Sequence, residues 1–169
     1  SLDGYATEQW VSEQGYLTEH QDLSEYAKLS DIESLMILIS ELQDRIKTLE
    51  SNIYSSDQLL EAINKLKEGE TLDLKLYNGI IISESNKMQI PQGATLNLNL
   101  NGNTIVTEFA DILFRVNGTL NISGEGTFAG KSYVASANVG GVVNVLNGTF
   151  ESNITALQAN GGIINIEDG

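Results

Sequence analysis

The chain has 169 residues and a formal net charge of −14, with nine Lys and Arg against 23 Asp and Glu. Only Arg115 and Lys131 are basic after residue 90. The sequence therefore lacks the clustered basic face with which proteins bind nucleic acids and anionic membranes. No apolar run reaches the length of a membrane-spanning helix, and the absence of cysteine excludes disulfides and thiolate metal sites. Twelve of the 16 glycines follow residue 90, which indicates a helical first part and a turn-rich second part.

Residues 1–29 are predicted to form an N-terminal attachment and linker region. Residues 4–8 and 15–19 share a Gly-Tyr-x-Thr-Glu word at an offset of 11 residues. A repeat this short builds no core of its own, and Thr7 and Thr18 are each expected to cap a brief helical turn, Thr18 with Gln21 as a capping box. We expect Trp10 and its neighbours to pack against other copies of the chain. The alternative interpretation is a flexible acidic linker.

The segment GYLTEHQDLSEYAK at residues 15–28 resembles a segment of tail-fibre and other appendage proteins of tailed bacteriophages and prophages, notably those of gut Bacteroidetes. The resemblance is local and supplies no catalytic residues. It implies a homotrimeric virion fibre whose N-terminal region contacts other virion proteins. His20 is the only histidine, and no partners are spaced to make it a metal ligand, so it is predicted to be a surface residue.

Residues 30–54 are predicted to form a coiled coil, because Ile falls at every a position and Leu at every d position of a heptad pattern. The expected oligomerisation residues are Ile32, Leu35, Ile39, Leu42, Ile46, Leu49 and Ile53. Ser30 is expected to be the N-cap, with Glu33 completing a capping box. A lone helix cannot cover this stripe, which predicts association with other copies. The alternative is an amphipathic helix packed within its own domain.

Two features of this segment point to different numbers of chains. Ile at a with Leu at d favours two strands in parallel coils. Met36, Ile37 and Leu38 widen the apolar face near the start, and a wider face suits more than two helices. We predict a homotrimer.

Residues 55–69 are predicted to form a short capping helix. Ser55 opens it, the apolar residues Leu59, Leu60, Ile63 and Leu66 recur at helical spacing, and Gly69 ends it. The passage from Asp57 to Leu72 is similar to the entry of right-handed parallel β-helices of the pectate-lyase-like kind. That resemblance implies that an amphipathic helix closes the open N-terminal end of the solenoid.

Residues 70–169 are predicted to form a parallel β-solenoid, because an apolar-Asn-apolar triplet recurs at intervals of 24, 23 and 21 residues. The triplets are Leu96-Asn97-Leu98, Leu120-Asn121-Ile122, Val143-Asn144-Val145 and Ile164-Asn165-Ile166. The aliphatic residues should face inward and the asparagines should form an outward column. Phe128 and Phe150 are expected to stack. The repeat is incomplete at Asp168-Gly169, so we expect the natural protein to continue as a longer solenoid.

Four Asn-x-Ser/Thr words begin at Asn117, Asn121, Asn147 and Asn153. Glycosylation of a secreted protein is one interpretation of them. We favour the other, that Asn, Gly and Thr are the residues from which solenoid corners are built.

Polysaccharide cleavage needs paired carboxylates or a carboxylate cluster around Ca²⁺. The carboxylates after residue 100 are scattered and are predicted to be solvated surface: Glu108, Asp111, Glu125, Glu151, Glu167 and Asp168. We predict no catalytic, cofactor-binding or metal-binding residue and no cofactor. Tyr133 and Phe109 are weak candidates for sugar contact.

The sequence therefore predicts a mixed fold, an N-terminal α-helical trimeric coiled coil followed by a right-handed parallel β-helix. The predicted function is structural and adhesive, as part of a phage virion fibre or tail spike, with host surface glycan as a candidate partner. A polysaccharide depolymerase, with its site on the solenoid or beyond residue 169, is one alternative. A bacterial trimeric surface adhesin is the other.

Overall fold

The computed structural model describes residues 7–14, 28–85, 88–131, 133–152 and 155–168. The chain divides into two compact units, residues 1–44 and residues 45–169. Within the first unit, α1 (Glu8–Glu13) is capped by Thr7, whose hydroxyl accepts a hydrogen bond from the backbone N–H of Trp10 at 3.2 Å. This confirms the expected cap at Thr7. Thr18, Gln21 and His20 lie outside the described residues.

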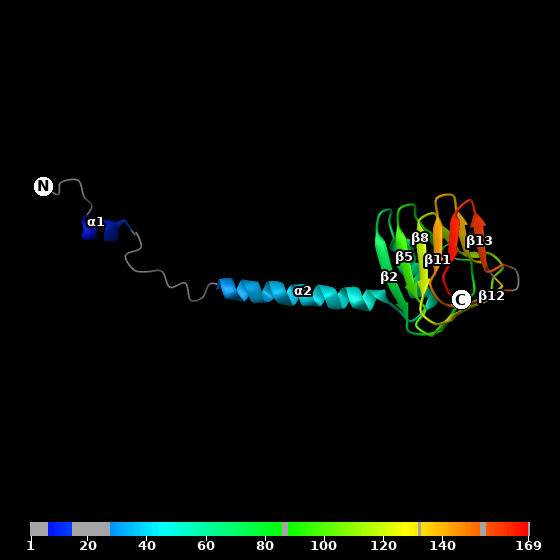
Figure 1. The fold of residues 1–169 in the computed structure, drawn as a ribbon. Coiled ribbons are helices and arrows are strands. Elements are labelled where there is room, and N and C mark those ends of the chain that lie inside the picture. Colours follow the sequence, from blue (N-terminus) through cyan, green and yellow to red (C-terminus); the bar gives the residue numbers. More distant parts are fainter. Residues whose placement is uncertain (1–6, 15–27, 86–87, 132, 153–154, 169) are drawn as a thin grey trace. The chain divides into compact units, whose positions relative to one another are not determined.

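Helix α2 (Leu29–Ser51) carries the heptad pattern (Figure 1). It begins one residue before Ser30, and the carboxylate of Asp31 accepts a hydrogen bond from the backbone N–H of Lys28 at 3.3 Å. The carbonyl of Ser30 accepts from the Ser34 hydroxyl at 2.8 Å, as a residue inside a helix does. The predicted Ser30 N-cap is therefore wrong, because Asp31 supplies the acceptor for the N-terminal backbone one turn earlier. Neither α1, α2 nor α3 has the length and apolarity to cross a bilayer.

The second unit contains the last turns of α2, helix α3 and a parallel β-solenoid of about five turns (Figure 1). The parallel solenoid was predicted from the sequence. The first rung is β2 (Thr71–Leu76), β3 (Ile80–Ile82) and β4 (Met88–Ile90). The second is β5 (Thr95–Asn99), β6 (Thr104–Thr107) and β7 (Ile112–Val116). The third is β8 (Thr119–Ser123), β9 (Thr127–Gly130) and β10 (Tyr133–Asn138). The fourth is β11 (Val142–Val145), β12 (Thr149–Ser152) and β13 (Leu157–Asn160), and β14 (Ile163–Ile166) follows.

Equivalent strands of successive rungs pair in parallel and form three sheets. Sheet A has the order β1-β2-β5-β8-β11-β14, sheet B the order β12-β9-β6-β3, and sheet C the order β13-β10-β7-β4. In sheet A the triplets align, so that Leu96 pairs with Leu120, Leu120 with Val143 and Val143 with Ile164. Because each strand pairs with the strand one rung away, the sequence period becomes the stacking period.

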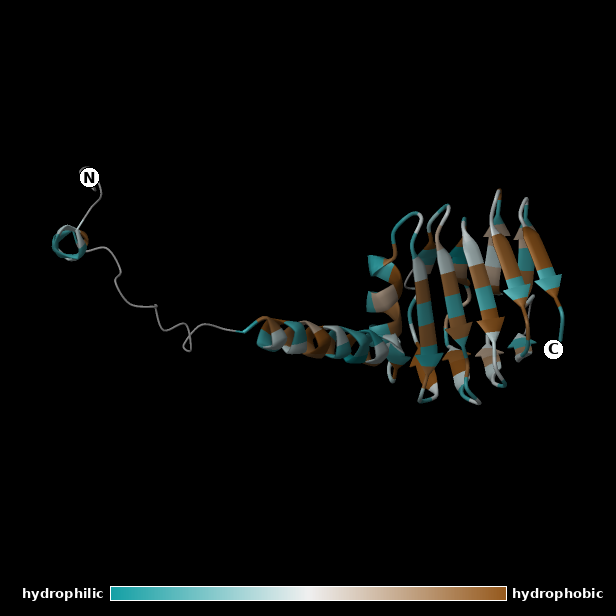
Figure 2. Ribbon diagram, turned by 60° about the vertical axis from the view of Figure 1, so that its left-hand side comes forward, coloured by the Kyte–Doolittle hydropathy of each residue, from teal (hydrophilic) through white to brown (hydrophobic). Residues whose placement is uncertain are grey.

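The core consists of the apolar side chains that point into the solenoid from alternate positions of each strand. Figure 2 shows apolar and polar segments alternating along the strands of the solenoid. Leu96, Leu98, Leu120 and Ile122 are fully buried, as predicted for the apolar positions of the triplets. Phe128 stacks on Phe150 with ring centroids 5.3 Å apart, which confirms the expected pair. Phe114 from the second rung forms a T-shaped pair with Phe128, with ring centroids 6.3 Å apart, and extends the aromatic cluster.

The outward asparagines of sheet A form one continuous hydrogen-bonded column, as predicted. Each amide Nδ2 donates to the side-chain oxygen one rung earlier. Asn97 donates to Asp73 at 2.7 Å, Asn121 to Asn97 at 2.6 Å, Asn144 to Asn121 at 2.7 Å and Asn165 to Asn144 at 2.7 Å. We call these five residues the sheet A column. Asp73 begins it, because the first member needs only to accept.

Corners between sheets use asparagine and glycine for defined reasons. Asn101 and Gly102 adopt positive φ angles of 50° and 77°, and the Asn101 side chain donates to the carbonyl of Leu76 at 2.9 Å. Asn117 accepts from Asn138 at 2.9 Å at the corner after sheet C. Asn117 thus lies at a corner, as the corner interpretation of the Asn-x-Ser/Thr words predicts, whereas Asn121 lies within β8 and belongs to the sheet A column. Asn153 lies outside the described residues.

Helix α3 (Ser56–Lys65) closes the N-terminal end of the solenoid, as predicted (Figure 2). Ser55 is its N-cap and accepts from the backbone N–H of Gln58 at 3.3 Å. The helix connects β1 (Asn52–Ile53) to β2 and contacts β1, β3 and β4. Its apolar face buries Leu59 and Ile63 against the first rung. The helix thereby takes the place that strands of sheets B and C hold in later rungs.

Candidate functional site

Helix α2 carries most of the exposed large hydrophobic side chains among the described residues, and its apolar stripe is part of them. The six residues of the stripe, Ile32, Leu35, Ile39, Leu42, Ile46 and Leu49, are between 45% and 69% exposed. No residue of α2 is buried. Because the structure holds a single chain, the coiled coil itself stays a prediction.

The seventh predicted stripe residue, Ile53, is not part of the stripe. The helix ends at Ser51, and Ile53 lies in β1, where it pairs with Leu76 and is 1% exposed. Its side chain belongs to the core beneath α3, so the assignment of Ile53 to oligomerisation is wrong. The heptad spacing persists through Ile53 because the same apolar residue type serves the solenoid core two residues after the end of the helix.

The last turns of α2 and helix α3 form a groove of about 800 Å³. Its apolar lining includes Ile46, Leu49, Ala62 and Leu72, and charged residues stand at its sides. One of these, Lys65, forms an ion pair with Glu61 at 2.8 Å. The sequence pattern placed Ile46 and Leu49 on the stripe but gave no sign of the groove, which forms only when β1 and α3 turn the chain back on itself.

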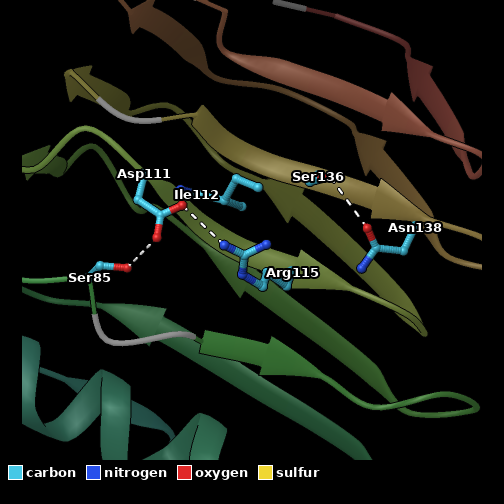
Figure 3. Close-up of polar contacts among 6 residues, drawn as sticks. All are labelled: Ser85, Asp111, Ile112, Arg115, Ser136 and Asn138. Carbon is cyan, nitrogen blue, oxygen red and sulfur yellow. Dashed lines mark hydrogen bonds and ion pairs between the residues drawn. The ribbon is translucent and has the colours of Figure 1, made fainter.

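One carboxylate is held by several groups at once, and Figure 3 shows this cluster. Asp111 Oδ1 accepts from the backbone N–H of Ile112 at 2.7 Å and pairs with Arg115 at 3.1 Å, while Oδ2 accepts from the Ser85 hydroxyl at 2.8 Å. The hydrogen bond from Ile112, then that from Ser85, and then the charge of Arg115 hold the pKa of Asp111 below its ordinary value of 3.8.

The Asp111 cluster ties loops of adjacent rungs together. A second bond of the same kind runs from the Ser83 hydroxyl to Glu108 at 2.8 Å. Both bonds join the loop after β3 to the loop after β6. On β10, the strand that pairs with β7, the Ser136 hydroxyl donates to the side-chain oxygen of Asn138 at 3.5 Å (Figure 3). An ionised, multiply bonded carboxylate suits a positioning role better than proton transfer.

An aromatic pair at the first corner was missed by the sequence reasoning. Tyr54 stacks on Tyr77 with centroids 5.3 Å apart, and the Lys75 ammonium lies 5.3 Å from the Tyr77 ring centre. Both rings are partly exposed. The spacing of Tyr54 and Tyr77 equals one solenoid period and could have predicted the pair. The sequence assigns Tyr54 to the helical part of the chain, because it precedes α3, and this hides the relation.

The aromatic candidates for sugar contact and the scattered carboxylates lie on several strands and loops of the solenoid. Tyr133 begins β10, an inner strand of sheet C, and Phe109 packs against the core from the loop before β7. Glu108 and Asp111 each accept a hydrogen bond from a serine of the loop after β3, whereas Glu151 lies on β12. Among the described residues, no three His, Asp or Glu side chains gather in a way that would hold a metal ion.

No protein-family model, curated protein or solved structure matches this chain.

Proposed function

We propose that this chain is a structural and adhesive component of a phage virion fibre or tail spike, in which α2 forms a trimeric coiled coil and the solenoid forms a stiff body. The observation that carries the proposal is the exposed stripe of α2. Six large aliphatic side chains lie along one face of the helix, and each is about half exposed or more. Removing this apolar surface from water is favourable in free energy. Sister copies of the same helix remove it most simply, since the stripe is complementary to itself in a parallel coil.

The charges beside the stripe favour parallel, in-register copies. Arg45 occupies a g position and Glu50 the following e position, and these positions meet between neighbouring helices of a parallel coil. The width of the apolar face near Met36 and Ile37 favours three helices over two. A right-handed winding of the solenoid is part of the proposal, because crossovers between parallel strands of one sheet have that hand almost without exception.

The solenoid is suited to a mechanical role. The sheet A column runs through every rung from Asp73 to Asn165, so side-chain hydrogen bonds reinforce the backbone ladders along the whole described length. The carboxylate best held by other groups, Asp111, joins two loops to each other. These features support a body that resists bending, and we propose a non-enzymatic role for it.

The virion assignment rests on the resemblance of residues 15–28 to phage appendage proteins. In this proposal the N-terminal region binds other virion proteins and the distal part of the solenoid faces the host surface, with surface glycan as the partner. The acidic charge of −14 is compatible with neither nucleic-acid binding nor attachment to anionic membranes, and neither is proposed.

Solution mass tests the oligomer. Native mass spectrometry of the full chain should give a mass near three times 18.3 kDa, and Leu42→Glu should release the monomer, because it places a charge in the middle of the seam. Glu41→Gln, on the polar side of the same helix, is the matched control and should keep the oligomeric mass. A wild-type monomer at micromolar concentration would remove the basis of the proposal.

Location separates the fibre from a bacterial adhesin. Antibodies against the purified chain should label appendages of phage particles recovered from cultures that carry the gene, as seen by electron microscopy. Labelling confined to the bacterial surface would instead favour the adhesin.

A further inference from the structure

The groove between α2 and α3 lies where the apolar stripe ends. It is lined by Ile46 and Leu49 of α2, by Ala62 of α3, and by Leu66 and Leu72 around the start of the first rung. Its volume is about 800 Å³. All of these residues belong to the second unit of the chain, so the groove is a feature of one compact body.

The exposure of its walls indicates what kind of occupant the groove takes. Ile46 and Leu49 remain about half or more exposed even though they line it, so the groove is open along the helix rather than enclosed. A small-molecule pocket buries most of its ligand and its own apolar walls. An open apolar groove that continues a helical stripe is the form in which a helix is bound, with anchors at i, i+3 and i+4. Ile46 and Leu49 have this spacing themselves.

The charges around the groove favour a second copy of this chain as its occupant. Glu50 lines the groove, and Glu61 and Glu70 add negative charge, while Lys65 is paired with Glu61. In a parallel coil in register, the Arg45 of a sister helix lies beside Glu50 and therefore at the groove. The same sister helix brings its own Ile46 and Leu49 to the apolar walls.

We propose that the last two turns of a sister α2 occupy this groove, so that the interface between copies extends beyond the stripe onto Ala62 of α3 and Leu72 of β2. This inference rests on the proposed self-association of α2 and adds its location. Its consequence is that α3 both closes the solenoid and contacts the neighbouring chain. The rotational position of each solenoid about the coil is then fixed by a packed surface.

Single-cysteine chains test the contact, because the natural sequence has no cysteine. One chain carries Leu49→Cys and a second, with a tag of different size, carries Ala62→Cys. The two are co-expressed as full chains and mildly oxidised. Each chain has one thiol, so a disulfide between residues 49 and 62 joins two chains and appears as a mixed-size dimer on a non-reducing gel. Replacing Ala62→Cys by Gln158→Cys, at an exposed position on β13, gives the matched control.

The outcomes separate this inference from the proposed function. A mixed dimer formed with Ala62→Cys and lost with Gln158→Cys supports the groove contact. Only Leu49→Cys homodimers, with the oligomeric mass retained, would overturn the groove contact and leave the coiled coil in place. A monomeric mass and no disulfide product from any pair would overturn both. Reduction of the mixed dimer should recover both chains at their original sizes.

Discussion

At the scale of single residues, the sheet A column shows why side-chain chemistry differs along an otherwise regular repeat. Asn121 both donates to Asn97 and accepts from Asn144, so it needs a donor and an acceptor on one short side chain. Asp73 only accepts, and there the sequence has a carboxylate. An amide is therefore required inside the column, whereas its first position tolerates either group.

Asn121→Asp should destabilise the solenoid, because a carboxylate cannot donate to Asn97 and places two acceptors against each other. We expect the free energy of unfolding to fall by about 1–3 kcal/mol, measured by urea denaturation at neutral pH. Asp73→Asn is the control and should change it by less than about 0.5 kcal/mol. Equal losses from the two variants would show that the column contributes no specific bonding.

The lowered pKa of Asp111 predicts a pH-dependent contribution to stability. Since the folded-state pKa lies below the ordinary 3.8, the ionised carboxylate stabilises the folded chain at pH values above 3.8, and this contribution is lost as the pH falls through the folded pKa. Asp111→Asn should therefore lower the free energy of unfolding at pH 7 and make little difference at about pH 2. Urea titrations of both proteins across this range measure the difference, and a difference independent of pH would contradict the role given to the carboxylate.

At the scale of elements, α3 is the piece on which the solenoid depends. A stack of rungs has an apolar bore, and α3 covers its first end with Leu59 and Ile63. Ile63→Ala should lower the free energy of unfolding by about 2–5 kcal/mol, since it leaves a cavity between the helix and the first rung. Asn64→Ala, one residue along on the exposed side, should have an effect within about 0.5 kcal/mol.

The end of α2 carries the charges expected to set the register of the coil. Arg45→Glu or Glu50→Arg alone should raise the dissociation constant of the oligomer, because each replaces an attraction between chains by a repulsion. The double variant Arg45→Glu with Glu50→Arg should return the constant toward the wild-type value. Sedimentation equilibrium at low and high salt measures this. Failure of the double variant to recover would argue against parallel chains in register.

At the scale of the whole molecule, association and folding should be linked. If sister chains cover the stripe only in the folded protein, the melting temperature should rise with protein concentration. The Leu42→Glu variant should melt at a temperature independent of concentration, since the solenoid folds around its own core. Scanning calorimetry over a hundredfold range of concentration, about 1 to 100 μM, tests this. A wild-type melting temperature that does not change with concentration would show that association and folding are not linked.

Much of the fold could be predicted from the sequence because it repeats. The triplets from Leu96 to Ile166 set the rung length, the inward side chains and the asparagine column, and the Phe128–Phe150 stack followed from equivalent positions. Six of the seven heptad residues lie exposed on α2, and their role in oligomerisation stays a prediction. The seventh, Ile53, lies in β1, since periodicity alone cannot tell where a helix ends and a strand begins.

The sequence by itself determined the solenoid, the capping helix and the exposed stripe, because each is encoded by local periodicity that a chain must express in order to bury its apolar residues. Only the tertiary structure decided that Ile53 belongs to the core, that Tyr54 stacks on Tyr77, that Asp111 joins two loops, and that α2 and α3 form a groove. These features arise from contacts between segments that are distant along the chain or separated by a turn. The position of Ile53, the tyrosine pair and the groove depend on how β1 and α3 bring the chain back to the first rung.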